Sequence, residues 1–172
     1  MGLVAVSKLK SYASVNNLQH HNSLTGKKHE EIKKTAHVVE VESPFTKGIK
    51  YSDFLKSLTN GKKPKSNAIR GIDVFMSASP GSIDGNVKEF ARDCYQWLCK
   101  TFGKECLYSM EIHTHENSPH IHAIICPSVN NSLNASYYLD GKAKMKAHQD
   151  SFHEAVKHYG LDRGISKELT GR

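Results

Sequence analysis

The stretch His113–His122 reads His-Thr-His-Glu-Asn-Ser-Pro-His-Ile-His and holds four of the eleven histidines of the chain within ten residues. Apolar runs flank it, Cys106–Ile112 before it and Ala123–Cys126 after it. Runs of this length and composition are typical of β-strands, and Asn117-Ser118-Pro119 between the histidines has the composition of a turn. The stretch therefore predicts a β-hairpin that carries imidazoles where its strands meet the turn.

The spacing of these histidines predicts a metal site. His120 and His122 are two residues apart, so on a strand both side chains project from the same face. His113 ends the preceding strand and can reach the same ion from the side. Three neutral imidazoles leave the other positions of a metal open, as a catalytic metal requires. Glu116, inside the turn, is a candidate fourth ligand, an orienting group for a ligand histidine, or a proton acceptor.

Other interpretations of the hairpin are weaker. His115 is a poor candidate ligand, because a turn that begins at Thr114 removes any fixed relation to the face of His113. A surface hairpin that is merely rich in histidine is the plain alternative to a metal site. A helical zinc-protease motif is excluded, because the chain has no His-Glu-x-x-His and Pro119 would break a helix there.

The rest of the chain predicts an α+β fold: a central antiparallel sheet with helices packed on one face of it. Besides the hairpin, strands are expected at Leu3–Leu9, His37–Val41 and Ala68–Ser77. Helices are expected at Asn16–Leu24, Tyr51–Leu58, Val87–Phe102 and Gly141–Tyr159. Asn16 or Asn17 is the expected cap of the first helix. The polar segment Pro127–Ser136 is expected to be a loop that can lie over the site.

Composition favours a single domain with an anionic partner. The 172 residues suffice for one core. The net charge of +7 and the isoelectric point near 9.2 favour nucleic acid over an acidic metabolite. No apolar run has the length of a membrane span and the first residues lack a signal-peptide core, so a cytoplasmic protein is expected. The four cysteines have no Cys-x-x-Cys spacing and are expected to be buried, reduced thiols.

Two motifs give the chain a family resemblance. A His-hydrophobic-His pair on a strand resembles the HUH endonucleases, which cut and rejoin single-stranded DNA. The fuller string His-x-x-Glu-x-x-Pro-His-x-His from His113 resembles the metal motif of the Mob/Pre plasmid mobilisation relaxases, as does Ala-Ile-Arg ending at Arg70. The chain departs from that family at His115, where an acidic residue is usual, and at Asn67, where an arginine is usual. Members usually continue into a long helical C-terminal region, which this chain is expected to lack.

The resemblance also implies a nucleophile. Mob/Pre relaxases have a His-Asn pair near the N-terminus, which corresponds to His21 and Asn22, and the histidine is the proposed nucleophile. The alternatives are that His20 and His21 are surface residues that touch DNA phosphates, or that Tyr12 is the nucleophile. The family arginine after the pair is replaced here by Ser23 and Leu24.

The resemblance further predicts the residues that contact DNA. Arg70 is expected to grip a phosphate and to assist catalysis, with a salt bridge at the end of a strand as the alternative. Asn22 and four lysines complete the predicted DNA contacts: Lys27, Lys28, Lys62 and Lys63.

The resemblance implies metal-dependent nicking and rejoining of one DNA strand at a plasmid or mobile-element transfer origin. The expected intermediate is a 5′-phosphate joined covalently to His21, and the expected partner is single-stranded or hairpin DNA. Manganese is the favoured metal and magnesium a possible one, while zinc or nickel can occupy such a site after purification. The sequence leaves the oligomeric state open.

Rival functions belong to other classes of protein. A replication-initiator nuclease would use the same metal hairpin with a tyrosine nucleophile, for which Tyr137, Tyr138 and Tyr159 are available. A non-catalytic DNA-binding module would tolerate loss of His120. A zinc hydrolase would form no covalent adduct.

Overall fold

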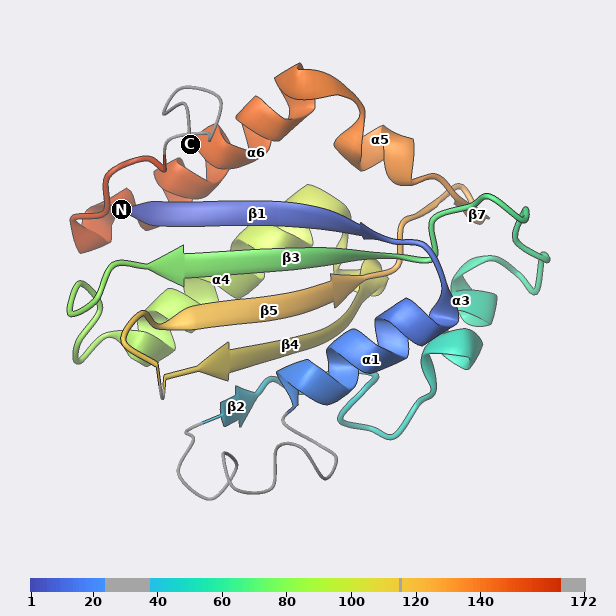
Figure 1. Cartoon of the computed structure of the whole chain (residues 1–172), viewed down its shortest axis with the longest axis horizontal. Helices are drawn as coiled ribbons and strands as arrows, with labels where there is room; N and C mark the ends of the chain where they lie inside the picture. Colours follow the sequence, from blue (N-terminus) through green and yellow to red (C-terminus); the bar gives the residue numbers. More distant parts are fainter. Residues whose placement is uncertain (24–37, 115, 165–172) are drawn as a thin grey trace.

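The computed structural model describes residues 1–23, 38–114 and 116–164. Its centre is a five-stranded sheet in the order β1-β3-β5-β4-β2, in which all neighbouring strands are antiparallel. The strands are β1 (Gly2–Leu9), β2 (Val38–Glu40), β3 (Gly71–Ala78), β4 (Leu107–His113) and β5 (His120–Ile125). The predicted hairpin is therefore confirmed, and it forms the middle of the sheet (Figure 1).

One face of the sheet is covered by α4 (Val87–Phe102) and α6 (Gly141–Val156). Figure 1 shows α4 behind the strands. The predicted bounds of α4 are confirmed, since apolar residues recur at helical spacing and Gly103, with φ of 89°, ends the helix. The strands contribute every second residue to this core, as Ile72, Val74 and Met76 of β3 do. The predicted last helix ends earlier, at Val156, and a 3-10 turn, Lys157–Tyr159, follows it.

The other face carries two shorter helices, α1 (Tyr12–Asn22) and α3 (Tyr51–Leu58). They enclose a second, smaller apolar cluster around Val15, Leu55 and Tyr108. Helices therefore cover both faces, and the expectation of helices on a single face is wrong. The expected helix at Asn16–Leu24 also begins too late. The Ser11 hydroxyl accepts a hydrogen bond from the Ser14 amide at 3.0 Å and starts α1 at Tyr12.

A β-bulge in β4 decides which side chains face α1. Leu107 pairs with Ile125 and Ser109 pairs with Ile124, so Tyr108 is an extra residue on β4. Tyr108 packs in the smaller cluster beside α3, and Ser109 is on the same face. Strict alternation from Tyr108 would have turned His113 toward α4. The bulge restores it to the face that carries α1.

The segment Pro127–Ser136 does not lie over the histidines. It forms a small hairpin of its own, β6 (Ser128–Val129) and β7 (Ser132–Leu133), before α5 (Ala135–Leu139). Figure 1 shows β7 at the opposite end of the sheet from the turn between β4 and β5. Within the described ranges, no helix is both long and apolar enough to cross a membrane.

The four thiols differ in exposure, which gives a first testable prediction. Burial raises the pKa of the Cys94 and Cys106 thiols and raises that of Cys126 to about 12, whereas Cys99 is partly exposed. Because the thiolate is the reactive form, we expect Ellman's reagent to label one thiol per native chain quickly and all four after unfolding. Rapid labelling of a Cys99→Ser variant would contradict the packing described here.

Candidate metal centre

Three histidines from the two central strands converge on the face that carries α1. His113 and His120 are direct partners across β4 and β5, and His122 lies two residues further along β5. The ring centroids are 5.0 to 5.2 Å apart, and one nitrogen of each ring lies within 4.8 Å of the others. His113 and His120 are buried and His122 is nearly so. The grouping predicted from strand spacing is therefore present in the fold.

Backbone carbonyls orient two of these rings. Nε2 of His113 lies 2.6 Å from the carbonyl oxygen of Asn22, and Nδ1 of His120 lies 3.0 Å from that of Ser118. A carbonyl oxygen only accepts, so each of these nitrogens donates its proton. In the neutral rings the lone pairs are then on Nδ1 of His113 and Nε2 of His120, the nitrogens that would bind a cation.

A carboxylate faces the third ring. Nδ1 of His122 is 4.0 Å from Oδ1 of Asp73, and neither atom has a hydrogen-bond partner within residues 1–23, 38–114 and 116–164. The negative charge favours a proton on Nδ1 and leaves Nε2 of His122 for a metal. The ring of Phe75 packs 5.2 to 5.3 Å from the centroids of His120 and His122 and limits their movement.

This donor set fits a divalent cation. Protein imidazoles bind such ions at about 2.0–2.1 Å and neutral nitrogen donors suit first-row transition metals. Each of the three rings has its second nitrogen engaged by a carbonyl or faced by a carboxylate, as is usual for ligand histidines. A cluster of histidines without a ligand role would not require this arrangement.

Glu116 approaches the cluster from outside. Its Oε2 lies 3.9 Å from Nδ1 of His120, and its side chain is 61% exposed. This position is on the Nδ1 side of the ring, away from Nε2. It suits a group that orients His120 or exchanges protons with solvent better than a direct ligand. His115 lies outside the described residues.

The helix end brings a fourth imidazole to the cluster. His21 lies in the last turn of α1, is exposed, and has its ring centroid 6.1 Å from that of His122, edge to face. Asn22, predicted to contact DNA, is instead fully buried, and its side-chain amide has no hydrogen-bond partner among the described residues. Its backbone carbonyl, which holds His113, is the part that reaches the site.

Arg70 is not brought to the histidines. Arg70 directly precedes β3, whereas the β3 residue that pairs with His122 is Phe75. At about 3.3 Å per residue, Arg70 is therefore about 16 Å along the strand from the position of His122. The guanidinium donates to the carbonyls of Lys65 and Ala68 and lies 5.8 Å above the ring of Tyr12. Tyr12 is also about 13 Å from His21 along α1 at about 1.5 Å per residue.

The lysines predicted to bind DNA fall into two groups. Lys62 and Lys63 border a cleft of about 340 Å³ beside β7, near Arg70, whose guanidinium donates to the carbonyl of Lys65. Lys65 also lines it. Lys27 and Lys28 lie outside the described residues.

The tyrosines considered as rival nucleophiles lie elsewhere. Tyr138 packs against Phe102, and the Tyr159 hydroxyl donates to Asp93 at 2.7 Å. Both contacts are with α4, so the sheet stands between these tyrosines and the histidines. Tyr137 is exposed and packs edge to face against Tyr138.

Two acidic residues at the site were not predicted. Glu111 is only 1% exposed and pairs across the strands with His122. Its position two residues before His113 was a usable signal, since such residues share a face. Asp73 had no local signal, because its approach to His122 depends on the pairing of β3 with β5.

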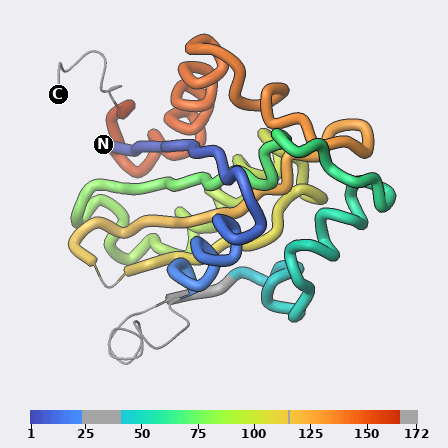
Figure 2. The backbone as a smooth tube through the Cα atoms, turned by 45° about the vertical axis from the view of Figure 1, so that its right-hand side comes forward, coloured from blue at the N-terminus to red at the C-terminus, as the bar shows by residue number. Residues whose placement is uncertain are grey.

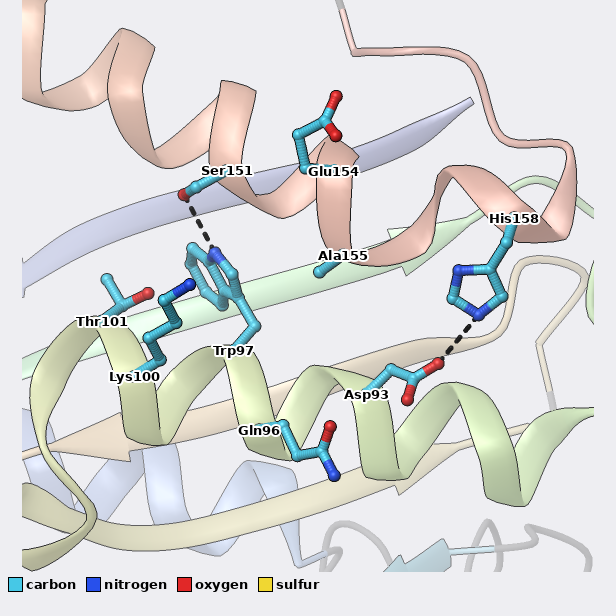
Figure 3. A pocket seen from close by; sticks show the side chains of 9 residues that line it. All are labelled: Asp93, Gln96, Trp97, Lys100, Thr101, Ser151, Glu154, Ala155 and His158. Carbon is cyan, nitrogen blue, oxygen red and sulfur yellow. Dashed lines mark hydrogen bonds and ion pairs between the residues drawn. The ribbon is translucent and has the colours of Figure 1, made fainter.

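A separate hollow of about 510 Å³ lies between α4 and α6 (Figure 3). Four of its polar side chains pair with one another: Trp97 Nε1 donates to Ser151 Oγ at 3.0 Å, and Asp93 Oδ2 lies 3.0 Å from His158 Nε2. Both helices pack on the sheet face opposite the histidines. This hollow is therefore not part of the candidate metal centre.

Comparison with known proteins agrees with the fold. Residues 1–172 match the model of a family described as plasmid recombination enzyme, Mob_Pre. The chain is 28% identical to plasmid recombination enzyme type 1 of Staphylococcus aureus over 99% of its own length and 46% of that protein. It is 25% identical to the type 3 enzyme of Mammaliicoccus lentus, over 98% and 44%. The chain thus spans less than half the length of these relatives.

Solved structures share the architecture. The MobM relaxase domain bound to origin DNA of plasmid pMV158, in a manganese-bound crystal structure, superposes with a TM-score of 0.78 at 15% identity, over 95% of this chain and 90% of that one. A complex of the same domain with 26-nucleotide origin DNA gives a TM-score of 0.74 at 14% identity, over 95% and 91%. At these identities the likeness concerns the fold.

Proposed function

Because the chain belongs to the plasmid recombination enzyme (Mob_Pre) family, we propose that it is a relaxase domain that nicks and rejoins one DNA strand at a plasmid or mobile-element transfer origin. The observation that carries this proposal is the exposed ring of His21, 6.1 Å from His122 of the three-histidine cluster. A nucleophile beside a cation site is the arrangement that phosphoryl transfer requires.

His21 is the proposed nucleophile. A neutral imidazole nitrogen attacks the scissile phosphorus, an N–P bond forms, and the bond from phosphorus to the 3′ oxygen breaks. The 3′ oxygen takes up a proton and leaves as a free hydroxyl, while the 5′-phosphate stays on the protein. Attack by a 3′ hydroxyl on the same phosphorus reverses the step and rejoins DNA without another energy source.

His113, His120 and His122 would hold a divalent cation. When bound, such an ion would polarise the scissile phosphate and offset the charge that develops on its oxygens. Manganese is the favoured ion: three imidazoles are a soft set for magnesium, and a structural neighbour is described as manganese-bound. Glu116 supports this site by orienting His120 or accepting a proton, since it lies 3.9 Å from that ring.

The DNA strand is proposed to extend from His21 along α1 to the basic end of the sheet. Arg70, Lys62 and Lys63 lie there, and Arg70 adds a cation above the ring of Tyr12. At the 3.4 Å rise per nucleotide of B-DNA, a span of about 16 Å corresponds to at most about five nucleotides, and a more extended single strand covers it with fewer. Arg70 is thus proposed to contact phosphates of the bound strand, at a distance from the reacting one.

The deciding experiment is covalent capture. The protein is incubated with a 5′- or 3′-labelled single-stranded origin oligonucleotide and manganese, then denatured. We expect an adduct that carries only the sequence 3′ of the nick and that chelation prevents. An acid-labile, base-stable link would identify a phosphoramidate. Turnover of a small phosphoester without any adduct would support the hydrolase instead.

Neutralising the basic cleft gives a prediction about binding. In Lys62→Ala/Lys63→Ala we expect weaker oligonucleotide binding and a slope of log Kd against log salt that is smaller by about 1.4, since each phosphate contact on a single strand contributes about 0.7. The matched control is Lys88→Ala/Lys100→Ala, which removes the same charge from exposed positions of α4. Equal slopes for the two pairs would rule out the cleft as a phosphate contact.

A further inference from the structure

The last turn of α1 is attached to β4 by buried polar contacts. Gln19 is 5% exposed, and its Nε2 donates to Oε1 of Glu111 at 2.6 Å. The hydroxyl of Ser109, itself fully buried, donates to Oε1 of the same amide. The side-chain nitrogen and oxygen of Gln19 are therefore both hydrogen-bonded to β4.

The same turn is tied to the metal histidines. The carbonyl of Gln19 accepts from the amide and the hydroxyl of Ser23, at 2.9 and 2.7 Å, and these bonds close the helix. The carbonyl of Asn22 accepts from Nε2 of His113 at 2.6 Å. His21 therefore stands between two residues that are each hydrogen-bonded to β4, the strand that contributes His113.

The two halves of α1 are held differently. Near its start, Val15 is fully buried in the smaller apolar cluster. Apolar packing is non-directional and permits small shifts along the axis. Near its end, the contacts are hydrogen bonds with preferred distances and directions. They fix the rotation of α1 about its axis and its position along that axis relative to β4.

We propose that Gln19 is a positioning residue, which sets where the ring of His21 stands relative to the metal histidines. This inference rests on the proposed function for its catalytic meaning. Gln19 touches neither DNA nor metal in this role, because it is buried beneath the helix. It acts through the register of α1 on β4, and a displacement of about 1 Å at a reacting group can lower a rate about 100-fold.

The bulge in β4 makes these hydrogen bonds between α1 and β4 possible. Ser109 and Glu111 both face Gln19, although Tyr108 before them also faces α3. The extra residue at Tyr108 allows all three to share one face. No local sequence pattern predicts the contact between Gln19 and Glu111, since the two residues are 92 positions apart.

The test compares Gln19→Met, which keeps the volume and loses the hydrogen bonds, with Val15→Ala, which loosens the apolar half of α1. For Gln19→Met we expect the single-turnover rate of adduct formation at saturating oligonucleotide to fall about 10- to 100-fold, with Kd changed less than about threefold. The nuclear Overhauser effect between the ring protons of His21 and His122 in the metal-free protein should also disappear.

Val15→Ala should lower the Tm at least as much as Gln19→Met does. It should nevertheless keep the rate of adduct formation within about threefold of wild type, and it should keep the contact between the rings of His21 and His122. The inference is overturned if Gln19→Met keeps the wild-type rate and the ring contact. It is also overturned if Val15→Ala loses the rate and the ring contact, since general stability would then explain the effect. In the double variant Gln19→Met/Ser109→Ala, no further loss is expected because the two residues share one bond. If wild-type protein forms no adduct, the proposed function fails, and the ring contact alone decides whether Gln19 positions His21.

Discussion

Replacing His21 with alanine is expected to remove the covalent adduct, with a fall in the rate of strand cleavage of about 10⁴-fold or more. Loss of a nucleophile has effects of this order or larger, because the remaining groups can only promote slow attack by water. The measurement is denaturing gel electrophoresis of protein with labelled origin oligonucleotide. Binding should change little, since His21 is one exposed side chain at the end of α1.

Two variants sharpen this result. Tyr12→Phe should form the adduct at the wild-type rate, because Tyr12 is at the far end of α1 beside Arg70. His20→Ala tests the neighbouring imidazole. An adduct that persists in His21→Ala and is lost in His20→Ala would move the nucleophile by one residue, while leaving the metal site unchanged.

Replacing His122 with alanine is expected to lower the affinity for manganese by at least about 100-fold, as measured by isothermal titration calorimetry. A group that merely orients a metal ligand contributes about 10- to 100-fold to affinity, so loss of one of three ligands should exceed that. Cleavage should become undetectable at metal concentrations that saturate the wild type.

The control for this variant is His153→Ala on α6, which removes an imidazole from the opposite side of the sheet. Its metal affinity should equal that of the wild type. The circular dichroism spectrum of His122→Ala should also be unchanged, because His122 belongs to neither apolar cluster. Tight, stoichiometric manganese binding by His122→Ala would contradict the three-histidine assignment.

The hairpin and its histidines were predictable because their signal is local. Two strands with a turn between them fix the face on which His120 and His122 lie, whatever the rest of the chain does. The long helix at Val87–Phe102 was predictable for the same reason, since its apolar spacing and Gly103 are contiguous. The family resemblance added His21, which no local pattern distinguishes from His20.

The remaining features depend on pairs that are distant in the sequence. Helices on both faces follow from the register of the sheet, which divides apolar residues into two clusters. The approach of Asp73 to His122, and that of Gln19 to Glu111, exist only after β3, β4 and α1 have been placed. The motif predicts that Arg70 grips a phosphate and assists catalysis, and only the strand register shows that Arg70 stands at the other end of β3 from the histidines.

The β-bulge at Tyr108 decides which side chains of β4 face α1 as much as the composition of the strand does. If β4 kept Tyr108 but paired with β5 without the bulge, regular alternation from Leu107 would turn Met110 and Ile112 toward α1 and would bury Glu111 and His113 against α4. Deletion of Tyr108 would instead leave a regular strand in which Ser109, Glu111 and His113 keep the face of α1, so its main cost is the loss of one aromatic side chain from the smaller apolar cluster. The alternation of side chains along β4 therefore shifts by one residue at the bulge, and His113 reaches the histidine cluster because it follows that shift.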